Sequence, residues 1–215
     1  MPANVQGRRA LEFTALFVLL PLVIAWQGET MRRWIIPQLL LITALCLVLL
    51  WRDPSFDRRR LLAWPHPWRA CVLRIILLLA IGGAAVLALA SQLPDVDPFA
   101  LPQQRPMLWL AILLLYPLIS ALPQELIFRV FLFHRYRALF PGHRTLPLVS
   151  AGVFAAAHLV LGNWVALLLS LAGGLLFAYT YARTGSLSLV TLEHGLWGNW
   201  LFTVGMGSYF YGGHI

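Results

Sequence analysis

Long apolar runs dominate this 215-residue sequence, and they restrict the folds open to it more than any other feature. About seven such runs occur, at residues 10–27, 34–51, 70–91, 107–122, 146–161, 164–182 and 186–206. Each approaches the roughly 20 residues with which an α-helix crosses the hydrocarbon core of a bilayer. The pattern predicts an all-α fold, a polytopic transmembrane bundle of about seven helices. The fourth run continues into a polar motif near residue 125.

The overall composition agrees with a membrane protein. Hydrophobic residues make up 60% of the chain and charged residues 11%, whereas soluble domains carry about 25% charged residues. The net charge is +8, and all 16 basic residues are arginines that cluster between the apolar runs. Such clusters are typical of topology signals at a membrane surface. We therefore expect the lipid bilayer as a partner and no nucleic acid.

The positions of the arginines predict how the chain is oriented in the membrane. If the N-terminus is cytoplasmic, the outer loops hold only Arg32, Arg33 and Arg105. The inner loops then hold Arg8, Arg9, Arg52, Arg58, Arg59, Arg60, Arg69, Arg135, Arg137, Arg144 and Arg183. The positive-inside rule favours this orientation and an extracytoplasmic C-terminus. A sequence without lysine and rich in Arg, Ala and Leu also suggests a bacterial inner membrane.

The first polar motif is Pro-Gln-Glu-Leu-Ile-Phe-Arg at residues 123–129, in the continuation of the fourth run. An ionisable side chain at membrane depth costs about 2.5–3.5 kcal/mol on insertion scales. Glu125 and Arg129 are four residues apart, so on a helix they share a face and are able to pair. The motif is therefore either a structural ion pair between helices or part of a functional site.

Two further polar motifs lie in later apolar runs. In the fifth run, His158 follows Phe154 after three alanines, and its polar partner must come from another helix. In the seventh run, Glu193 and His194 are followed by Asn199. Between these motifs, small residues at four-residue spacing predict a closely packed face on the sixth helix. They are Ser170, Gly174 and Ala178.

Polar motifs on three separate helices make chemical sense if they meet at one site. A carboxylate in a low-dielectric pocket is able to accept a proton from water near neutral pH. A histidine beside it can orient the same water and later protonate a leaving amine, and a second histidine with an amide can stabilise an oxyanion. These groups together are suited to hydrolysis of a peptide bond by water.

The three motifs resemble those of the CPBP family, which contains CAAX proteases and bacteriocin-processing enzymes of the membrane. That family carries Glu-Glu-x-x-x-Arg, Phe-x-x-x-His and His-x-x-x-Asn on successive transmembrane helices. Here the corresponding segments are Gln124 to Arg129, Phe154 to His158, and His194 with the residues after it. The resemblance implies a protease core at 107–215, preceded at 1–106 by transmembrane helices without a motif, all within one membrane domain.

Carried over by position, the resemblance implies that His158 activates water, that His194 lies on the oxyanion side and that Arg129 is the motif arginine. Two positions depart from the family. Gln124 replaces the first glutamate, which is the usual base, and Gly198 stands where the asparagine is expected, with Asn199 one residue later. One residue turns a side chain by about 100° around a helix. We expect Glu125 to be the base, with Gln124, Arg129 and Asn199 in supporting roles.

Three functions remain open at this stage. The first is an intramembrane endopeptidase without a cofactor, which cleaves a membrane-embedded or membrane-proximal protein or peptide through Glu125, His158 and His194. The second is a zinc-dependent protease in which the same three side chains bind the metal. The third is a non-catalytic binding or scaffold protein, which the replacement of the usual glutamate by Gln124 favours.

Overall fold

The computed structural model describes residues 3–211, and all regular secondary structure within that range is helical. The first helices are α1 (Ala3–Thr14), α2 (Leu20–Gln27), α3 (Glu29–Arg32), α4 (Ile35–Arg52), α5 (Trp68–Ala90) and α6 (Ala100–Gln104). They are followed by α7 (Pro106–Tyr116), α8 (Leu122–Glu125), α9 (Leu132–Tyr136), α10 (Thr145–Ala157), α11 (Trp164–Thr184), α12 (Leu187–Thr203) and α13 (Ser208–Tyr211). The predicted all-α fold is confirmed.

Five helical stretches within the described range are long and apolar enough to cross a membrane. They are Asn4–Gln27, Ile35–Arg52, Trp68–Ala90, Pro106–Tyr136 and Trp164–Thr184. The fifth predicted run forms a shorter apolar helix over Thr145–Leu161, and the seventh forms the 17-residue α12. An integral membrane protein is thus confirmed, while the count of seven spanning helices stays a prediction.

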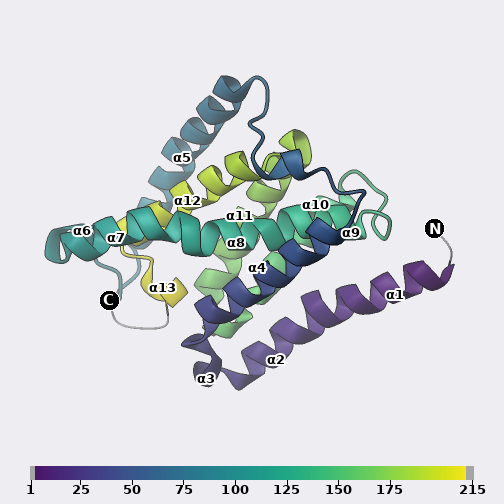
Figure 1. Cartoon of the computed structure of the whole chain (residues 1–215). Helices are drawn as coiled ribbons and strands as arrows, with labels where there is room; N and C mark the ends of the chain where they lie inside the picture. The colour runs from purple at the N-terminus through teal and green to yellow at the C-terminus, as the bar shows by residue number, and fades with distance from the viewer. Residues whose placement is uncertain (1–2, 212–215) are drawn as a thin grey trace.

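The fourth predicted run and the first polar motif form one continuous helix of 31 residues, Pro106–Tyr136. It comprises α7, α8 and α9, joined by π-helical stretches at Pro117–Ala121 and Leu126–Phe131 (Figure 1). Pro106 opens the helix at a position where the missing N–H costs nothing. The short α8, which carries the motif, lies between two π-helical stretches, and such stretches are frequent at functional sites.

Helices α11 and α12 begin and end at residues that favour helix termini. Asn163 caps α11, because its side-chain oxygen accepts a hydrogen bond of 2.7 Å from the backbone N–H of Ala166. Gly185 ends α11 with a left-handed backbone at φ 62°. Ser186 then caps α12 by accepting the N–H of Leu189 at 3.2 Å. These caps fix the first residue of α12 and thereby the position of His194 along that helix.

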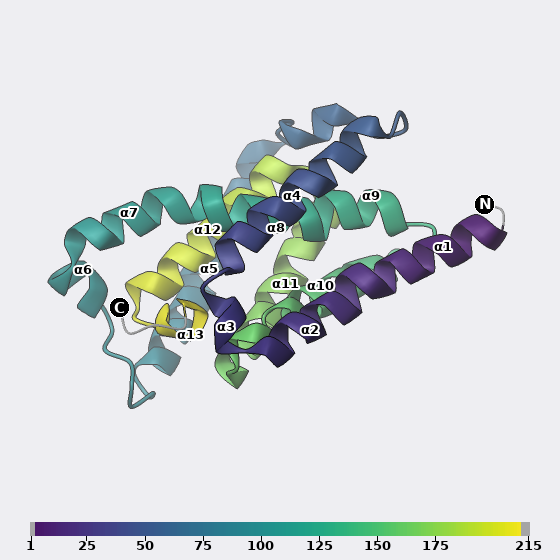
Figure 2. The ribbon, with the colours of Figure 1, turned by 60° about the horizontal axis from the view of Figure 1, so that its bottom comes forward.

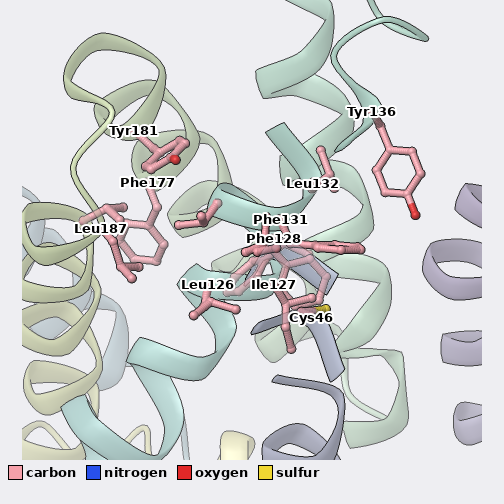
Figure 3. Close-up of a cluster of buried hydrophobic side chains, with 14 of the residues drawn as sticks. Cys46, Leu126, Ile127, Phe128, Phe131, Leu132, Tyr136, Phe177, Tyr181 and Leu187 are labelled. Atoms are coloured by element: carbon pink, nitrogen blue, oxygen red, sulfur yellow. The ribbon is translucent and has the colours of Figure 1, made fainter. Parts of the chain in front are cut away.

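The α7–α9 helix runs through the middle of the molecule, in contact with α12 and with α4 (Figure 1 and Figure 2). Helices α10 and α11 pack against each other, and α2 contacts α10. The buried apolar cluster shown in Figure 3 lies where these elements meet. In it, Ile127, Phe128 and Phe131 of the central helix lie near Cys46 of α4. Cys46 is therefore a packing residue, as expected, and it is not in a disulfide.

The small-residue face predicted for residues 170–178 is present on α11. Ser170 and Ala178 are buried. A Cβ atom added to Gly174 would lie 3.2 Å from the backbone Cα and O atoms of Ala151 on α10. Glycine at this position therefore allows the two helix backbones to approach closely. The close approach also leaves the Gly174 carbonyl within reach of the polar motif.

Candidate active site

Glu125 is fully buried and contacts two other motif residues. Its Oε2 atom lies 3.2 Å from Nε of Arg129, four residues later on the same helix. Its Oε1 atom accepts a hydrogen bond of 2.8 Å from Nδ1 of His194 on α12. The pairing predicted from the four-residue spacing is confirmed, and it brings two of the three predicted motifs into contact. The contact of Oε2 with Arg129 is an ion pair without hydrogen-bond geometry, so among the described residues only Oε1 of this buried carboxylate accepts a hydrogen bond.

Arg129 is also fully buried, on the motif helix. Its Nη2 donates to the carbonyl oxygen of Gly174 at 3.3 Å. Its guanidinium carbon lies 4.8 Å from the centre of the Phe154 ring, in a cation–π contact. Arg129 therefore joins α8, α10 and α11 around the carboxylate of Glu125, and its charge offsets the charge of Glu125.

His194 lies between the carboxylate and the ring of a tyrosine. Because a carboxylate oxygen accepts, the contact of Nδ1 with Glu125 favours the tautomer in which Nδ1 carries the hydrogen and Nε2 is an acceptor. Nε2 lies 3.1 Å from the hydroxyl of Tyr116 at the end of α7. The imidazole stacks on Phe177, with ring centres 4.5 Å apart and planes 19° from parallel. These contacts hold the ring in one orientation.

His158 is held by its own helix rather than by a charged group. It follows the last residue of α10, and its Nδ1 lies 2.8 Å from the carbonyl oxygen of Phe154. A carbonyl oxygen only accepts, so Nδ1 carries the hydrogen and Nε2 is left as the acceptor. The Phe154 ring lies 4.7 Å from the His158 ring and 5.7 Å from the His194 ring, so one aromatic side chain contacts both histidines.

Both histidines line one large cavity of about 1490 Å³. Its polar wall includes Gln124, His158 and His194. The remaining lining is mainly aliphatic and comes from helices on both sides of the motif, for example Ile24, Leu39, Ile42, Ile112 and Leu115. No Asp or Glu is found among the described residues that line it. A cavity of this kind suits an apolar segment whose polar backbone meets the two imidazoles.

Of the two neighbours Gln124 and Glu125, only Gln124 lines the cavity. Its Nε2 donates to the Oγ atom of Ser120 at 2.9 Å. Its Oε1 atom is buried and has no hydrogen-bond partner among the described residues. The departure from the family pattern therefore places an amide where a ligand in the cavity would meet it, while the carboxylate lies behind, against His194 and Arg129.

Asn199 does not line the cavity. Its Nδ2 donates to the carbonyl oxygen of Leu113 at 3.1 Å. In a regular helix that carbonyl would accept the N–H of the residue four positions later, which is Pro117 and has none. Asn199 therefore satisfies a backbone group that the proline leaves free within an apolar region. Asn199 thus contacts the backbone of the central helix, and its supporting role in the site stays a prediction.

The sequence motifs did not indicate Tyr116, although its hydroxyl contacts His194. A single tyrosine in an apolar run is usually a packing residue, and sequence position gives no sign of a contact between residues 78 positions apart.

Glu193, beside His194, is fully buried and faces another partner, with Arg74 Nη1 at 3.9 Å. Arg74 also donates to Thr180 Oγ1 at 2.9 Å. This second polar cluster ties α5, α11 and α12 together.

The three residues of the zinc hypothesis do not form a metal-binding group in this arrangement. Within residues 3–211, no cluster of three or more His, Cys, Asp and Glu side chains has a geometry that could hold an ion. Both carboxylate oxygens of Glu125 already face protein partners. Of the three side chains in the zinc hypothesis, only His158 and His194 line the cavity.

Residues 106–201 match the model of a family described as Rce1-like, the type II CAAX prenyl endopeptidases. The predicted resemblance to the CPBP family is confirmed. The matched segment contains all three polar motifs and ends inside α12, whereas the N-terminal helices lie outside it. Because CPBP relatives of this type are endopeptidases, the match supports a hydrolase. Neither among curated proteins nor among solved structures did the chain have a match.

Proposed function

We propose that this protein is an intramembrane endopeptidase that hydrolyses a peptide bond in a membrane-embedded or membrane-proximal segment of another protein. The observation that carries the proposal is the cavity, which combines two imidazole acceptors with an aliphatic lining. Such a lining favours an apolar peptide over a soluble loop. We further propose that the protein lies in a bacterial inner membrane with its N-terminus in the cytoplasm.

In the proposed reaction, His158 removes a proton from a water molecule that attacks the scissile carbonyl. Its Nδ1–H donates a hydrogen bond to the Phe154 carbonyl, so the free lone pair on Nε2 is available to accept the water proton. After the attack, the same nitrogen returns the proton to the leaving amine. A positioned general base of this kind contributes about 10²–10⁴-fold to a rate.

Glu125 acts in this proposal through His194. It accepts the Nδ1–H of His194 and so fixes the tautomer and the orientation of that ring. The direct role as base that the sequence suggested would require Glu125 to exchange its contact with Arg129 or His194 for a water. Gln124 is proposed to hold the substrate backbone, because its side chain lies on the cavity wall.

Comparative proteomics tests the proposal on all proteins of the membrane at once, so that no single substrate has to be chosen. Membranes from cells with the protein, without it and with the His158→Ala variant are compared for precursors that fail to shorten. We expect at least one membrane protein to keep its full length in both the deletion and the variant. Identical peptide termini in all three membranes would contradict the proposed activity.

The zinc-dependent alternative has a test of its own. We expect purified, active protein to contain less than one equivalent of zinc and to keep its activity after dialysis against a chelator. The expectation rests on the full engagement of Glu125 by protein groups. Stoichiometric zinc together with loss of activity on chelation, restored by added zinc, would favour the alternative.

A non-catalytic binding function is the second candidate, and one observation favours it. The cavity wall carries the amide of Gln124, and the described lining residues include no carboxylate. A protein of this kind would hold an apolar peptide or lipid in the cavity without turnover. The two candidates differ in a single property, cleavage by the natural sequence.

A further inference from the structure

Gly198 has no side chain, and the ring of Tyr116 lies in the space that a side chain there would fill. A Cβ atom built on Gly198 would lie 2.1 Å from Cε1 of Tyr116, 2.4 Å from its Cζ and 2.5 Å from its hydroxyl oxygen. These distances are far below van der Waals contact. Glycine at 198 is therefore a requirement of the position that Tyr116 occupies.

The tyrosine hydroxyl lies beside His194 on the wall of the cavity. It is 3.1 Å from Nε2 of His194, and Tyr116 is among the residues that line the cavity. The phenol ring packs edge-on against Phe202, with ring centres 5.5 Å apart and an angle of 65° between the planes. The ring is thus fixed by packing, while its O–H is free to rotate about the C–O bond.

Neighbouring backbone contacts keep Tyr116 in this place. The next residue, Pro117, begins a π-helical stretch and packs close to Gly195, where an added Cβ would lie 3.1 Å from the proline Cβ. The carbonyl of Leu113, which Pro117 leaves free, accepts the side chain of Asn199. Two glycines and an asparagine of α12 therefore allow the end of α7 to lie against it.

We propose that the Tyr116 hydroxyl is the oxyanion donor of this site, in the place that an amide side chain at position 198 would otherwise fill. The inference rests on the proposed protease function. The water oxygen bonds to the carbonyl carbon, the water proton passes to His158 Nε2, and the carbonyl electron pair moves onto oxygen. The Tyr116 O–H then turns from His194 to that oxyanion. The C–N bond breaks as His158 protonates the amine.

The proposal is tested with full-length protein in liposomes and a synthetic peptide that spans the cleavage site found by proteomics. Tyr116→Phe keeps the ring and removes only the hydroxyl. We expect kcat to fall by about 10²–10³-fold with KM nearly unchanged, the usual effect of losing one oxyanion donor. The control is Tyr179→Phe, which removes the hydroxyl of a half-exposed tyrosine on α11 and is expected to be neutral.

A swap of side chains separates catalysis from packing. Tyr116→Ala is expected to lose activity, and the double variant Tyr116→Ala/Gly198→Asn is expected to recover at least tenfold, because the amide enters the vacated space. Gly198→Ala alone should also lower kcat, because the added Cβ displaces the tyrosine ring. It retains the hydroxyl, so it keeps the test informative if Tyr116→Phe fails to fold.

The outcomes distinguish a failure of the proposed Tyr116 role from a failure of the proposed protease function. Full activity of a folded Tyr116→Phe variant, alongside loss in His158→Ala, would overturn the tyrosine proposal and leave the protease function intact. No cleavage by the wild type above His158→Ala would overturn the protease function, and the role of Tyr116 with it. Recovery in the double variant would support both.

Discussion

The N-terminal half of the described chain (residues 3–106) and the C-terminal half (residues 107–211) bury different kinds of side chain. Within the described residues, every buried polar or charged side chain lies between positions 125 and 194. The buried residues of the N-terminal half are apolar or glycine, for example Phe17, Cys46 and Ile75. Helices of that half nevertheless line the cavity. The C-terminal half therefore buries the polar motif residues, whereas the N-terminal half lines the cavity with mainly aliphatic side chains together with polar ones such as Arg32, Arg33 and Gln38.

Polar contacts between the halves occur near helix ends and along α5. Glu12 of α1 accepts hydrogen bonds from Arg135 and, at 2.7 Å, from the hydroxyl of Tyr136. Tyr136, labelled in Figure 3, belongs to the buried apolar cluster, and its ring packs edge-on against Phe13 and Phe17 of the N-terminal half. Asp53, just after α4, pairs with His134 at 3.0 Å. Along α5, Arg74 also contacts Glu193 and Thr180, and the Gly83 carbonyl accepts a hydrogen bond of 3.0 Å from Trp200 Nε1. The halves are therefore joined by polar contacts both near helix ends and along α5.

The largest expected difference between the halves comes from removing a buried charge. Arg129→Met leaves Glu125 without its countercharge, and breaking a buried pair in this way costs about 3–5 kcal/mol. We expect the free energy of unfolding in detergent to fall by that amount. The matched control, Arg52→Met, removes an exposed arginine at the end of α4 and is expected to change it little. Equal losses in the two variants would contradict the comparison.

A smaller loss of stability is expected when a side-chain amide is replaced by leucine, and the loss should differ between the two halves. Asn199→Leu leaves the Leu113 carbonyl without a partner, at a cost of about 1–3 kcal/mol. The control, Gln38→Leu, loses only a contact of 3.3 Å to the sulfur of Met31. Thermal unfolding of the two variants in the same detergent measures the difference. A Gln38→Leu variant that is as unstable as Asn199→Leu would place essential polar packing in the N-terminal half as well.

The smallest expected effect concerns the contact between the halves at Asp53. Hydrogen bonds from Ser55, and then from His134, lower the pKa of Asp53 from 3.8 to about 2. A lowered pKa in the folded state means that the ionised carboxylate adds stability above pH 4, and that this is lost as the pH falls toward 2. We expect the Tm difference between wild type and Asp53→Asn to shrink as the pH falls from 4 toward 2.

The Asp53 effect is small because the side chain is partly exposed, and solvent weakens such pairs. Ser55→Ala is a useful companion variant, since it removes the largest cause of the lowered pKa. A Tm difference that persists unchanged down to pH 2.5 would show that the Asp53 carboxylate is not the source of the stabilisation.

Much of the fold follows from the sequence because apolar run length alone predicts spanning helices. The continuation of the run at 107–122 into the motif helix, the packing role of Gly174 and the Glu125–Arg129 pair were all predicted from the sequence. That this helix extends to residue 136 was not predicted. The π-helical stretches beside the motif were not predicted either, since they depend on how α12 packs against Pro117. The early end of α10 at Ala157 was missed for a similar reason, because hydropathy continues past it.

The sequence indicated the three polar motifs, but it indicated neither the contacts between residues of different motifs nor the contact with Tyr116. No spacing rule links Glu125 to His194, which lies 69 positions later, or either of them to Tyr116. Sequence position also could not tell which of Gln124 and Glu125 faces the cavity, because that depends on the helix distortions on either side. The catalytic roles of these residues stay predictions.

Cleavage by the natural sequence, compared with Gln124→Glu, is the measurement that tests the central claim most directly. Both proteins are purified at full length, placed in liposomes and incubated with membranes from cells that lack the protein, and new peptide termini are counted over time. The proposed mechanism predicts that the wild type cleaves, that Gln124→Glu changes the rate by less than about tenfold, and that His158→Ala, which removes the proposed base, lowers it by about 10²–10⁴-fold. Cleavage by Gln124→Glu alone, with a silent wild type, would contradict it and identify the natural protein as a binding protein.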